Sequence, residues 1–315
     1  MTSDAPKAMT ATTWALLIVL GIVWGASFFF GRVAVQVVPP LTLVFFRVFL
    51  AAITLHIYLF GRNRLYRTLV SRWRAFALLG FLNNIIPFTL IFLGQTQIGA
   101  GLAAILNATT PLWTVVIANR LTGDEKMTLH KIIGCLIGLA GTVVLIGPSA
   151  LTGLGAPLWA QLAIIGAALS YGFAAIYGKQ FGDLPPVVTA TGQLTASSLI
   201  MIPIVLLIDR PWTGSMPSPE ILVSIVLLAV LSTAFAYILY FSIIKRSGAT
   251  NASLVTLIVP AAAILLGAAF LQERLSIDHM TGLALIAVGL LAIDGRLPQM
   301  LKNKVSLMRY TNRES

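Results

Sequence analysis

Residues 99–111 read GAGLAAILNATTP, and residues 248–260 read GATNASLVTLIVP. Aligned at an offset of 149 positions, both stretches begin with Gly-Ala, share an alanine at the fifth position and end on proline. Matching residues recur on either side of them, in the pairs Pro39-Pro40 and Pro185-Pro186, Glu125 and Glu273, Gly134 and Gly282, and Gly141 and Gly289. This order at a near-constant offset predicts two copies of one structural unit.

The composition indicates what kind of unit is duplicated. Of the 315 residues, 58% are hydrophobic and only 10% are charged, with a mean hydropathy of +0.93. A soluble domain carries about 25% charged residues. Apolar runs of roughly 20 residues, the length needed to cross a bilayer, recur along the whole chain. We identify ten, at about 13–31, 41–60, 75–94, 100–119, 128–147, 157–178, 187–208, 220–243, 251–271 and 279–295.

Each copy contains five of these runs. Because five is odd, the second copy enters the membrane from the side opposite to the first. The predicted fold class is therefore an all-α integral membrane protein with ten transmembrane helices arranged as two inverted five-helix repeats. The predicted segments are a cytoplasmic N-terminal tail (1–12), the first repeat (13–147), an extracytoplasmic linker (148–156), the second repeat (157–295) and a basic cytoplasmic C-terminal tail (296–315).

The distribution of charge sets the expected orientation. With the N-terminus inside and ten spans, 17 of the 21 basic residues fall in cytoplasmic segments. This bias follows the positive-inside rule and places both termini in the cytoplasm, at the cell inner (plasma) membrane. The net charge of +11 is then explained by topology and by contact with anionic lipid head groups, and we expect no nucleic-acid partner. No obligate protein partner is evident. The single cysteine, Cys135, lies within a span and allows no disulfide.

The double five-helix repeat, the LNATTP motif at 106–111 and the glutamate after the fourth and ninth spans resemble the drug/metabolite transporter superfamily. The similarity is greatest to its ten-helix EamA-type branch of metabolite and amino-acid exporters, and it covers roughly residues 14–146 and 158–295. The resemblance implies ten helices, both termini in the cytoplasm and a central cavity walled mainly by helices 1, 3, 4, 6, 8 and 9. It does not imply one substrate.

Polar side chains in the apolar runs indicate where such a cavity lies. Residues 81–95 read FLNNIIPFTLIFLGQ, and the adjacent amides Asn83 and Asn84 correspond to Ser232 and Thr233 in the second repeat. An unpartnered amide in hydrocarbon costs several kcal/mol, on the order of 2–7, so these groups are expected to face protein or water. The alternative is that they bond neighbouring helices. The predicted substrate-binding residues are Trp24, Ser27, Asn83, Asn84, Asn107, Tyr171, Ser232, Thr233, Tyr237 and Thr256.

Three further features carry expectations, and the first two of them have an alternative. The repeat-related Pro111 and Pro260 are predicted hinges, with static kinks as the alternative. Arg47, the one ionised residue well inside a span, is a possible charge partner for a carboxylate or forms a structural bond to an adjacent helix. Glu125 and Glu273 are expected to stabilise the N-termini of the fifth and tenth helices.

The functional prediction is a secondary transporter that exports amino acids or related zwitterionic compounds by alternating access. The alternatives are a multidrug or cationic-compound efflux carrier, a metabolite importer and, less favoured, a channel. No zinc motif, nucleophile elbow or phosphate loop is present, so we expect no enzyme activity, no cofactor and no metal. The absence of an acid at the centre of any span argues against a classical proton antiporter, or it moves the task of carrying the proton to His56 or to the substrate itself. Cationic drugs could still bind aromatic faces, although carriers of that kind often have a membrane-buried glutamate, which these spans lack.

Overall fold

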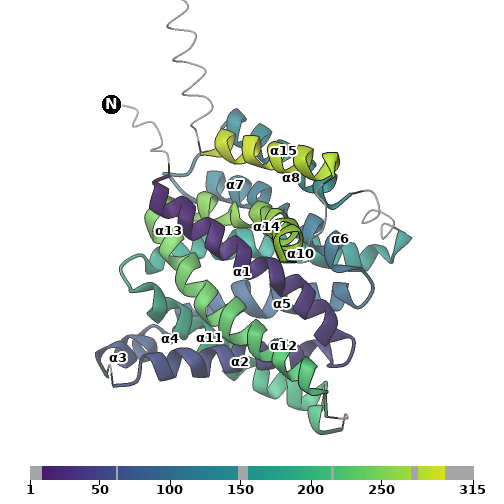
Figure 1. The fold of residues 1–315 in the computed structure, drawn as a ribbon. Helices are drawn as coiled ribbons and strands as arrows, with labels where there is room; N and C mark the ends of the chain where they lie inside the picture. Colours follow the sequence, from purple (N-terminus) through teal and green to yellow (C-terminus); the bar gives the residue numbers. More distant parts are fainter. Residues whose placement is uncertain (1–8, 62, 148–154, 214–215, 271–275, 295–315) are drawn as a thin grey trace, which may run out of the picture.

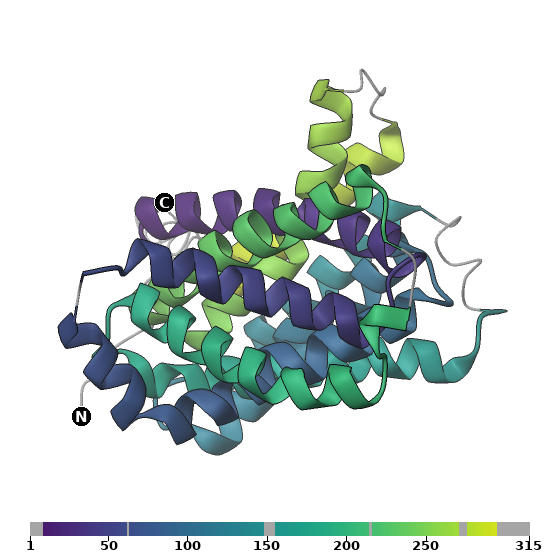
Figure 2. The ribbon, with the colours of Figure 1, turned by 90° about the horizontal axis from the view of Figure 1, so that it is seen from below.

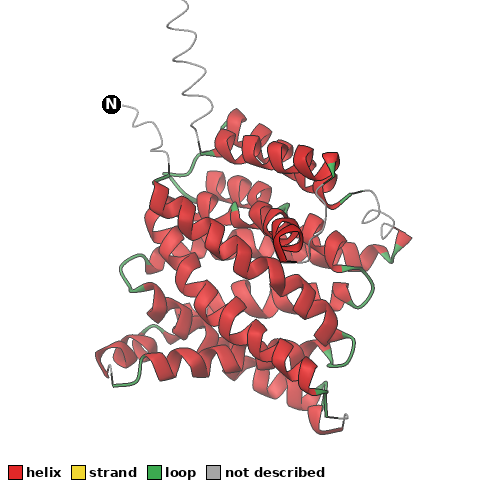
Figure 3. Cartoon of the chain, in the orientation of Figure 1, coloured by secondary structure: helices red, strands yellow, loops and turns green. Residues whose placement is uncertain are grey.

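The computed structural model describes residues 9–61, 63–147, 155–213, 216–270 and 276–294. Every regular element in these ranges is a helix (Figures 1 and 3). In the first half the elements are α1 (Ala11–Val35), α2 (Pro40–Tyr58), α3 (Asn63–Ser71), α4 (Trp73–Gly80), η1 (Phe81–Ile85), α5 (Ile86–Gln95), α6 (Ala100–Asn107), α7 (Thr110–Leu121) and α8 (Leu129–Ile146). In the second half they are α10 (Leu158–Gly178), η3 (Lys179–Phe181), α11 (Pro186–Leu207), η4 (Pro211–Thr213), α12 (Pro219–Ala229), η5 (Val230–Phe235), α13 (Ala236–Ser253), α14 (Val255–Phe270) and α15 (Ile277–Ile293).

Eight helical stretches in the described ranges are long and apolar enough to cross a membrane. The last of them, Pro219–Ser253, combines α12, η5 and α13, and its backbone turns at Gly248, whose φ is +85°. After it come α14 with 16 residues and α15 with 17, both apolar but shorter. The membrane-spanning, all-helical class is thus confirmed, whereas the count of ten spans stays a prediction. The 296–315 tail and most of the 1–12 tail and the 148–156 linker lie outside the described residues.

The sequence explains where several of these helices begin. Pro40 and Pro186 are the first residues of α2 and α11. Proline is suited to that position because its fixed φ is helical and because the first amides of a helix have no partner to lose. One helix was not expected: α3 forms within the basic segment between the second and third predicted spans. It connects α2 to α4 at the edge of the bundle (Figure 1).

The helices α8 and α15 pack directly against each other through glycines (Figure 1). A Cβ atom added to Gly134 would lie 2.8 Å from the Gly289 carbonyl oxygen, and one added to Gly141 would lie 2.9 Å from that of Gly282. Only glycine permits such a close approach of two backbones. The later residue of α8 meets the earlier residue of α15, so these two helices, which correspond in the sequence repeat, run antiparallel.

The segments that hold the adjacent polar pairs are both π-helical. Asn83 and Asn84 lie in η1, while Ser232 and Thr233 lie in η5. A π-helical turn inserts one extra residue and interrupts the regular hydrogen-bond ladder, and it is frequent at functional sites. The same rare conformation therefore occurs at the positions that the sequence alignment equates.

Neighbouring helices bring the two halves of the chain together. Figure 2 shows α2 and α11 side by side, and these two helices correspond in the repeat. At one end of the bundle the backbone amide of Met9, just before α1, donates to the Asp294 carboxylate, just after α15, at 2.7 Å. The start of the first helix and the end of the last thus lie at the same end of the molecule.

The contacts of Glu125 differ from those that the sequence predicted. Its carboxylate accepts the backbone amides of Ala249 and Thr250 at 2.9 and 2.8 Å, directly after Gly248. Lys179 lies 2.8 Å away. Glu125 therefore caps a helical segment of the second half, whereas we predicted that it would cap the fifth helix, which follows it in sequence. Only packing between the halves could reveal this contact. Glu273 lies outside the described residues.

Candidate functional site

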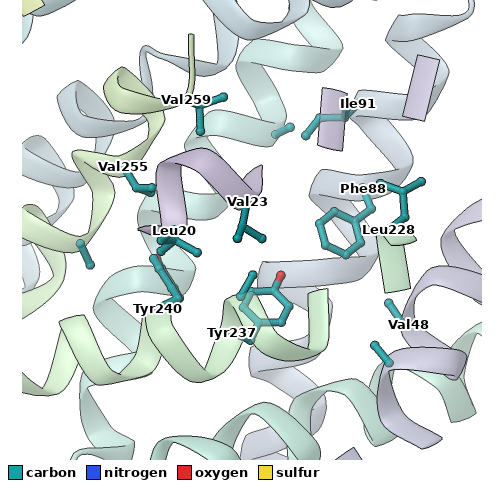
Figure 4. Packing of buried hydrophobic residues seen from close by; sticks show 14 of the residues in the cluster. Leu20, Val23, Val48, Phe88, Ile91, Leu228, Tyr237, Tyr240, Val255 and Val259 are labelled. Carbon is teal, nitrogen blue, oxygen red and sulfur yellow. The ribbon is translucent and has the colours of Figure 1, made fainter. Parts of the chain in front are cut away.

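A cavity of about 60 Å³ lies between helices of both halves. Its lining residues come from α1, α2, η1, α5, α6, α7, α10, α13 and α14. They are Trp24, Ser27, Phe28, Arg47, Asn83, Phe88, Ile91, Phe92, Gln95, Asn107, Thr110, Tyr171, Tyr240, Ser253, Val255, Thr256 and Val259. Figure 4 shows part of these walls, with Phe88 of α5 and Tyr240 of α13 approaching from different sides. The cavity combines an aromatic surface with uncharged hydrogen-bonding groups and one cation.

Six of the ten predicted binding residues line this cavity, and so does Arg47. The six are Trp24, Ser27, Asn83, Asn107, Tyr171 and Thr256. They come from five segments that are far apart in the sequence, so their convergence is a property of the tertiary structure.

Arg47 is held at the cavity wall by groups of the second half. Its side chain is 6% exposed, Nε donates to Thr233 Oγ1 at 2.8 Å, and Nη2 lies 3.5 Å from the Ser232 carbonyl oxygen. The guanidinium carbon lies 3.8 Å from the centre of the Phe88 ring, a cation–π contact. No described acid forms an ion pair with Arg47, and no Asp or Glu lines the cavity. The wall thus carries a positive charge that the described side chains do not neutralise.

The other four predicted residues do not line the cavity but bond the helices behind it. They are Asn84, Ser232, Thr233 and Tyr237. Tyr237 donates to Asn84 Oδ1 at 2.6 Å and lies 3.0 Å from the Asn83 carbonyl oxygen. The Asn84 amide also donates to Ser197 at 2.9 Å. These contacts match the alternative considered for polar side chains in membrane helices, namely satisfaction by a neighbouring helix.

Repeat-related residues make corresponding contacts in this layer. Arg47 of α2 bonds Thr233 of η5, as described above. Its counterpart in the repeat, Gln193 of α11, accepts a hydrogen bond at 3.0 Å from Asn83 of η1. In each half, a polar residue on the second span therefore contacts the π-helical segment of the other half. Gln193 aligns with Arg47 at an offset of 146 positions, which is also the offset between Pro39-Pro40 and Pro185-Pro186, and the sequence alone gives no reason for this pairing.

Trp24 joins α1 to the second half. Its indole Nε1 donates to the Ser232 carbonyl oxygen at 3.1 Å, and its ring centre lies 5.5 Å from that of Tyr240. Tyr171, which aligns with Trp24 at an offset of 147 positions in the repeat, lines the same cavity from α10. The ring of Trp24 is thereby fixed in orientation at the wall.

The predicted hinge prolines differ in their settings. Pro111 is near the start of α7, and the chain between α6 and α7 is not helical at Ala108 and Thr109. Proline cannot donate to the carbonyl of Asn107, and the Thr110 hydroxyl bonds that carbonyl at 2.7 Å. Pro260 lies inside α14. A break in helix 4 next to Pro111 is therefore present, and its movement during function remains a proposal.

Several cavity residues were not predicted from the sequence. The main ones are Phe88, Phe92 and Gln95 of α5, together with Tyr240. The first three are spaced i, i+4 and i+7, which places them on one helix face. That spacing could have identified Gln95 as an inward-facing polar residue. Among the described residues, no group of three or more His, Cys, Asp or Glu side chains is arranged to hold a metal ion.

Comparison with known proteins identifies the family. The EamA-like transporter family matches residues 12–147 and again residues 158–293. The chain is 25% identical to the uncharacterized transporter YoaV of Bacillus subtilis, over 87% of this chain and 94% of that one. It is 26% identical to the uncharacterized inner membrane transporter YedA of Escherichia coli K12, over 88% of this chain and 89% of that one. Protein PecM of Dickeya dadantii is 26% identical over 86% and 89% of the two chains.

One crystal structure, whose printed description is simply "Crystal structure of protein", has the same fold. Its TM-score is 0.69 at 18% sequence identity, and the alignment covers 92% of this chain and 98% of that one. With the family matching both halves of the chain, the chain belongs to the EamA-like transporter family of the drug/metabolite transporter superfamily, as the sequence resemblance predicted, and is a multi-pass membrane transporter of small molecules.

Proposed function

We propose that the protein is a secondary transporter that exports amino acids or related zwitterionic compounds by alternating access. Both termini lie in the cytoplasm, and the substrate occupies the cavity around Arg47. The observation that carries this proposal is the buried guanidinium of Arg47 in an otherwise uncharged cavity. An isolated charge is expensive to bury unless it is paired. A substrate carboxylate would supply the missing partner with bidentate geometry.

Two inverted repeats would supply the two access states. Three observations support the inversion: the family matches the chain twice, the repeat-related helices α8 and α15 run antiparallel, and both halves have a π-helical segment at the same aligned position. The contact between Met9 and Asp294 supports an even number of spans, because the start of the first helix and the end of the last helix lie on the same side of the bundle. Each half could then adopt the arrangement that the other half holds.

The charge of the cavity argues against the alternative of a cationic-drug carrier. A cationic solute entering the cavity would meet Arg47 with no acid among the lining residues to offset the repulsion. The aromatic walls alone would have to compensate for that repulsion. A zwitterion or an organic anion gains from the same charge.

The test is counterflow of radiolabelled amino acids in proteoliposomes, with Arg47→Gln as the variant. We expect saturable exchange by the wild type and a loss of about tenfold or more in apparent affinity in the variant, since a charge-assisted hydrogen bond contributes about 1.5–3 kcal/mol. Arg67→Gln is the matched control because Arg67 is exposed on α3. Thermal unfolding in detergent checks that both variants fold.

Two results would overturn the proposal. One is the absence of exchange for every amino acid in the panel by correctly folded wild-type protein. The other is equal affinity for a carboxylate-bearing solute in Arg47→Gln and the wild type. Inside-out and right-side-out vesicles then determine the direction, because uptake that requires the cytoplasmic face outward indicates export, and the opposite requirement indicates an importer.

A further inference from the structure

The described lining residues offer few partners to an ammonium group. None of them is an Asp or a Glu. The side-chain oxygens of Gln95 and Asn107 are enclosed by protein and present no surface to a solute. The hydroxyl groups of Ser253 and Thr256 already donate to backbone carbonyl oxygens three residues earlier, at 2.7 and 2.9 Å. A primary ammonium has three N–H donors, and each donor that leaves water without finding an acceptor carries a penalty. An amino acid in this cavity therefore needs another partner for its ammonium group.

An aromatic side chain lies next to Arg47. Trp24 Nε1 donates to the Ser232 carbonyl oxygen at 3.1 Å, and Arg47 Nη2 lies 3.5 Å from the same oxygen. The indole and the guanidinium are therefore neighbours. In an α-amino acid the ammonium nitrogen lies only about 2.5 Å from the carboxylate carbon, given bond lengths near 1.5 Å. The groups that bind these two charges must then also be neighbours, and a carboxylate at Arg47 brings the ammonium to Trp24.

Trp24 and Tyr240 together form a wall of the cavity. Their ring centres are 5.5 Å apart and their planes are inclined by 43°. Both residues line the cavity, and Figure 4 shows Tyr240 reaching it from α13. Trp24 keeps part of its surface exposed. The face of an aromatic ring carries the negative part of its quadrupole, and its attraction for a cation is strongest where water is excluded. The wall is thus an uncharged site for a cation.

We infer that the cavity binds the substrate ammonium on the rings of Trp24 and Tyr240, and that it therefore favours zwitterions with an N-methylated ammonium over primary amino acids. This inference rests on the proposed function and adds the class of substrate. Each methyl group replaces an N–H donor that the cavity does not satisfy, and it brings apolar surface against the ring faces. Recognition by a carboxylate or by amide oxygens would give the opposite order, because those partners bind N–H groups.

The carboxylate of the substrate remains necessary. Without it the ammonium would face the guanidinium of Arg47 directly, and like charges repel strongly where little water screens them. A simple quaternary cation such as choline is therefore excluded, although it carries the same trimethylammonium group as a betaine. The site differs in this respect from an aromatic cage for free cations.

The test uses unlabelled competitors in the counterflow assay. Glycine, sarcosine, dimethylglycine and glycine betaine differ only in the number of N-methyl groups. We expect the apparent affinity to rise along this series, with that for glycine betaine at least about tenfold above that for glycine. The anion tert-butylacetate has the shape of glycine betaine but a carbon atom in place of the charged nitrogen, and we expect it to bind at least about tenfold more weakly than glycine betaine. Choline should not compete.

A variant of the wall tests where the ammonium binds. In Trp24→Leu the ratio of the affinities for glycine betaine and tert-butylacetate should fall towards about one, because the cation–π contact is lost. This ratio is measured within one variant, so it does not depend on how much of that variant folds. Trp159→Leu is the matched control, because Trp159 is 49% exposed on α10 and does not line the cavity. It should keep the wild-type ratio.

Three results would overturn the inference and leave the amino-acid carrier intact. They are a wild type that binds glycine more tightly than glycine betaine, equal affinities for glycine betaine and tert-butylacetate, and an unchanged ratio in Trp24→Leu. A wild type that exchanges neither an amino acid nor glycine betaine would overturn both the inference and the proposed function.

Discussion

The carboxylate of Glu125 connects three parts of the chain, and replacing it by glutamine tests how much that connection contributes to stability. In the wild type it accepts two backbone amides after Gly248 at 2.9 and 2.8 Å and pairs with Lys179 at 2.8 Å. The Glu125 side chain is 12% exposed and that of Lys179 is 23% exposed, so solvent screens these contacts little. Glu125→Gln keeps the size of the side chain but removes its charge and turns one acceptor into a donor.

The expected loss follows from those contacts. One charge-assisted hydrogen bond disappears and one backbone amide faces an NH₂ group, so we expect the free energy of unfolding to fall by about 2–3 kcal/mol. Asp124→Asn is the matched control. Asp124 pairs with the same Lys179 at 2.6 Å, but its side chain is 69% exposed. An exposed pair contributes about 0–1 kcal/mol.

The single cysteine provides the assay. Cys135 on α8 is 2% exposed, so a thiol-reactive fluorogenic dye reacts with it only as the protein unfolds in detergent. Melting curves by this method should show a lower midpoint for Glu125→Gln than for Asp124→Asn. If the two variants melted together, or if Glu125→Gln melted with the wild type, the carboxylate would not be the stabilising contact described here.

The pH dependence gives an independent check. Burial raises the pKa of the Glu125 carboxyl, but hydrogen bonds from Lys179 and from the backbone amides of Thr250 and Ala249 outweigh it, so the pKa in the folded protein is below its usual value. The stability from this group is therefore fully present above the ordinary glutamate pKa of about 4.3, and it is lost as the pH falls through the lowered folded value. The difference in melting midpoint between wild type and Glu125→Gln should accordingly be large at neutral pH and shrink in acid. A constant difference would contradict this assignment.

Three further predictions concern packing and topology. Gly282→Ala should destabilise the bundle by about 1–3 kcal/mol, because the added Cβ would lie 2.6 Å from the Leu145 backbone nitrogen. Gly166→Ala is the control and should change the melting midpoint little, because its added Cβ would meet only a flexible side-chain atom at 3.4 Å. Trp24→Phe keeps an aromatic ring at the cavity but loses the hydrogen bond to the Ser232 carbonyl, and we expect a loss of about 1 kcal/mol by the same melting assay. Tags at the two chain ends should be accessible to an impermeant probe from the same side of the membrane, the cytoplasmic one, and labelling from opposite sides would exclude an even number of spans.

The sequence predicted the membrane class and most helices because their signals are local or periodic. A run of about 20 apolar residues can satisfy its backbone only as a helix in a bilayer, whatever surrounds it. The helix α3 was missed because its nine residues include polar and basic side chains and are too few to form an apolar run of the length that crosses a bilayer. The turn at Gly248 falls in the interval that the sequence left between the eighth and ninth predicted spans, 220–243 and 251–271, but the sequence did not indicate which residue in that interval turns the chain.

The cavity could be predicted only in part. Adjacent Asn83 and Asn84 were both expected to face a solute, yet only Asn83 lines the cavity while Asn84 bonds Ser197 and Tyr237. Neighbours on a helix point in directions about 100° apart, given 3.6 residues per turn, and the local π-helical turn shifts that phase further. The rotation of each helix in the bundle, which the sequence does not record, therefore decides between the two roles.

By itself the sequence determined that this chain is a duplicated, membrane-embedded helical transporter, because hydropathy and the spacing of Pro, Gly and Glu are properties of the linear chain. Only the tertiary structure decided which polar groups meet. It placed Arg47 against Phe88 and Thr233 and brought Glu125 to the amides after Gly248. In two of these three contacts the partners are more than 100 residues apart. Whether they meet depends on how the apolar segments pack, which no local pattern specifies.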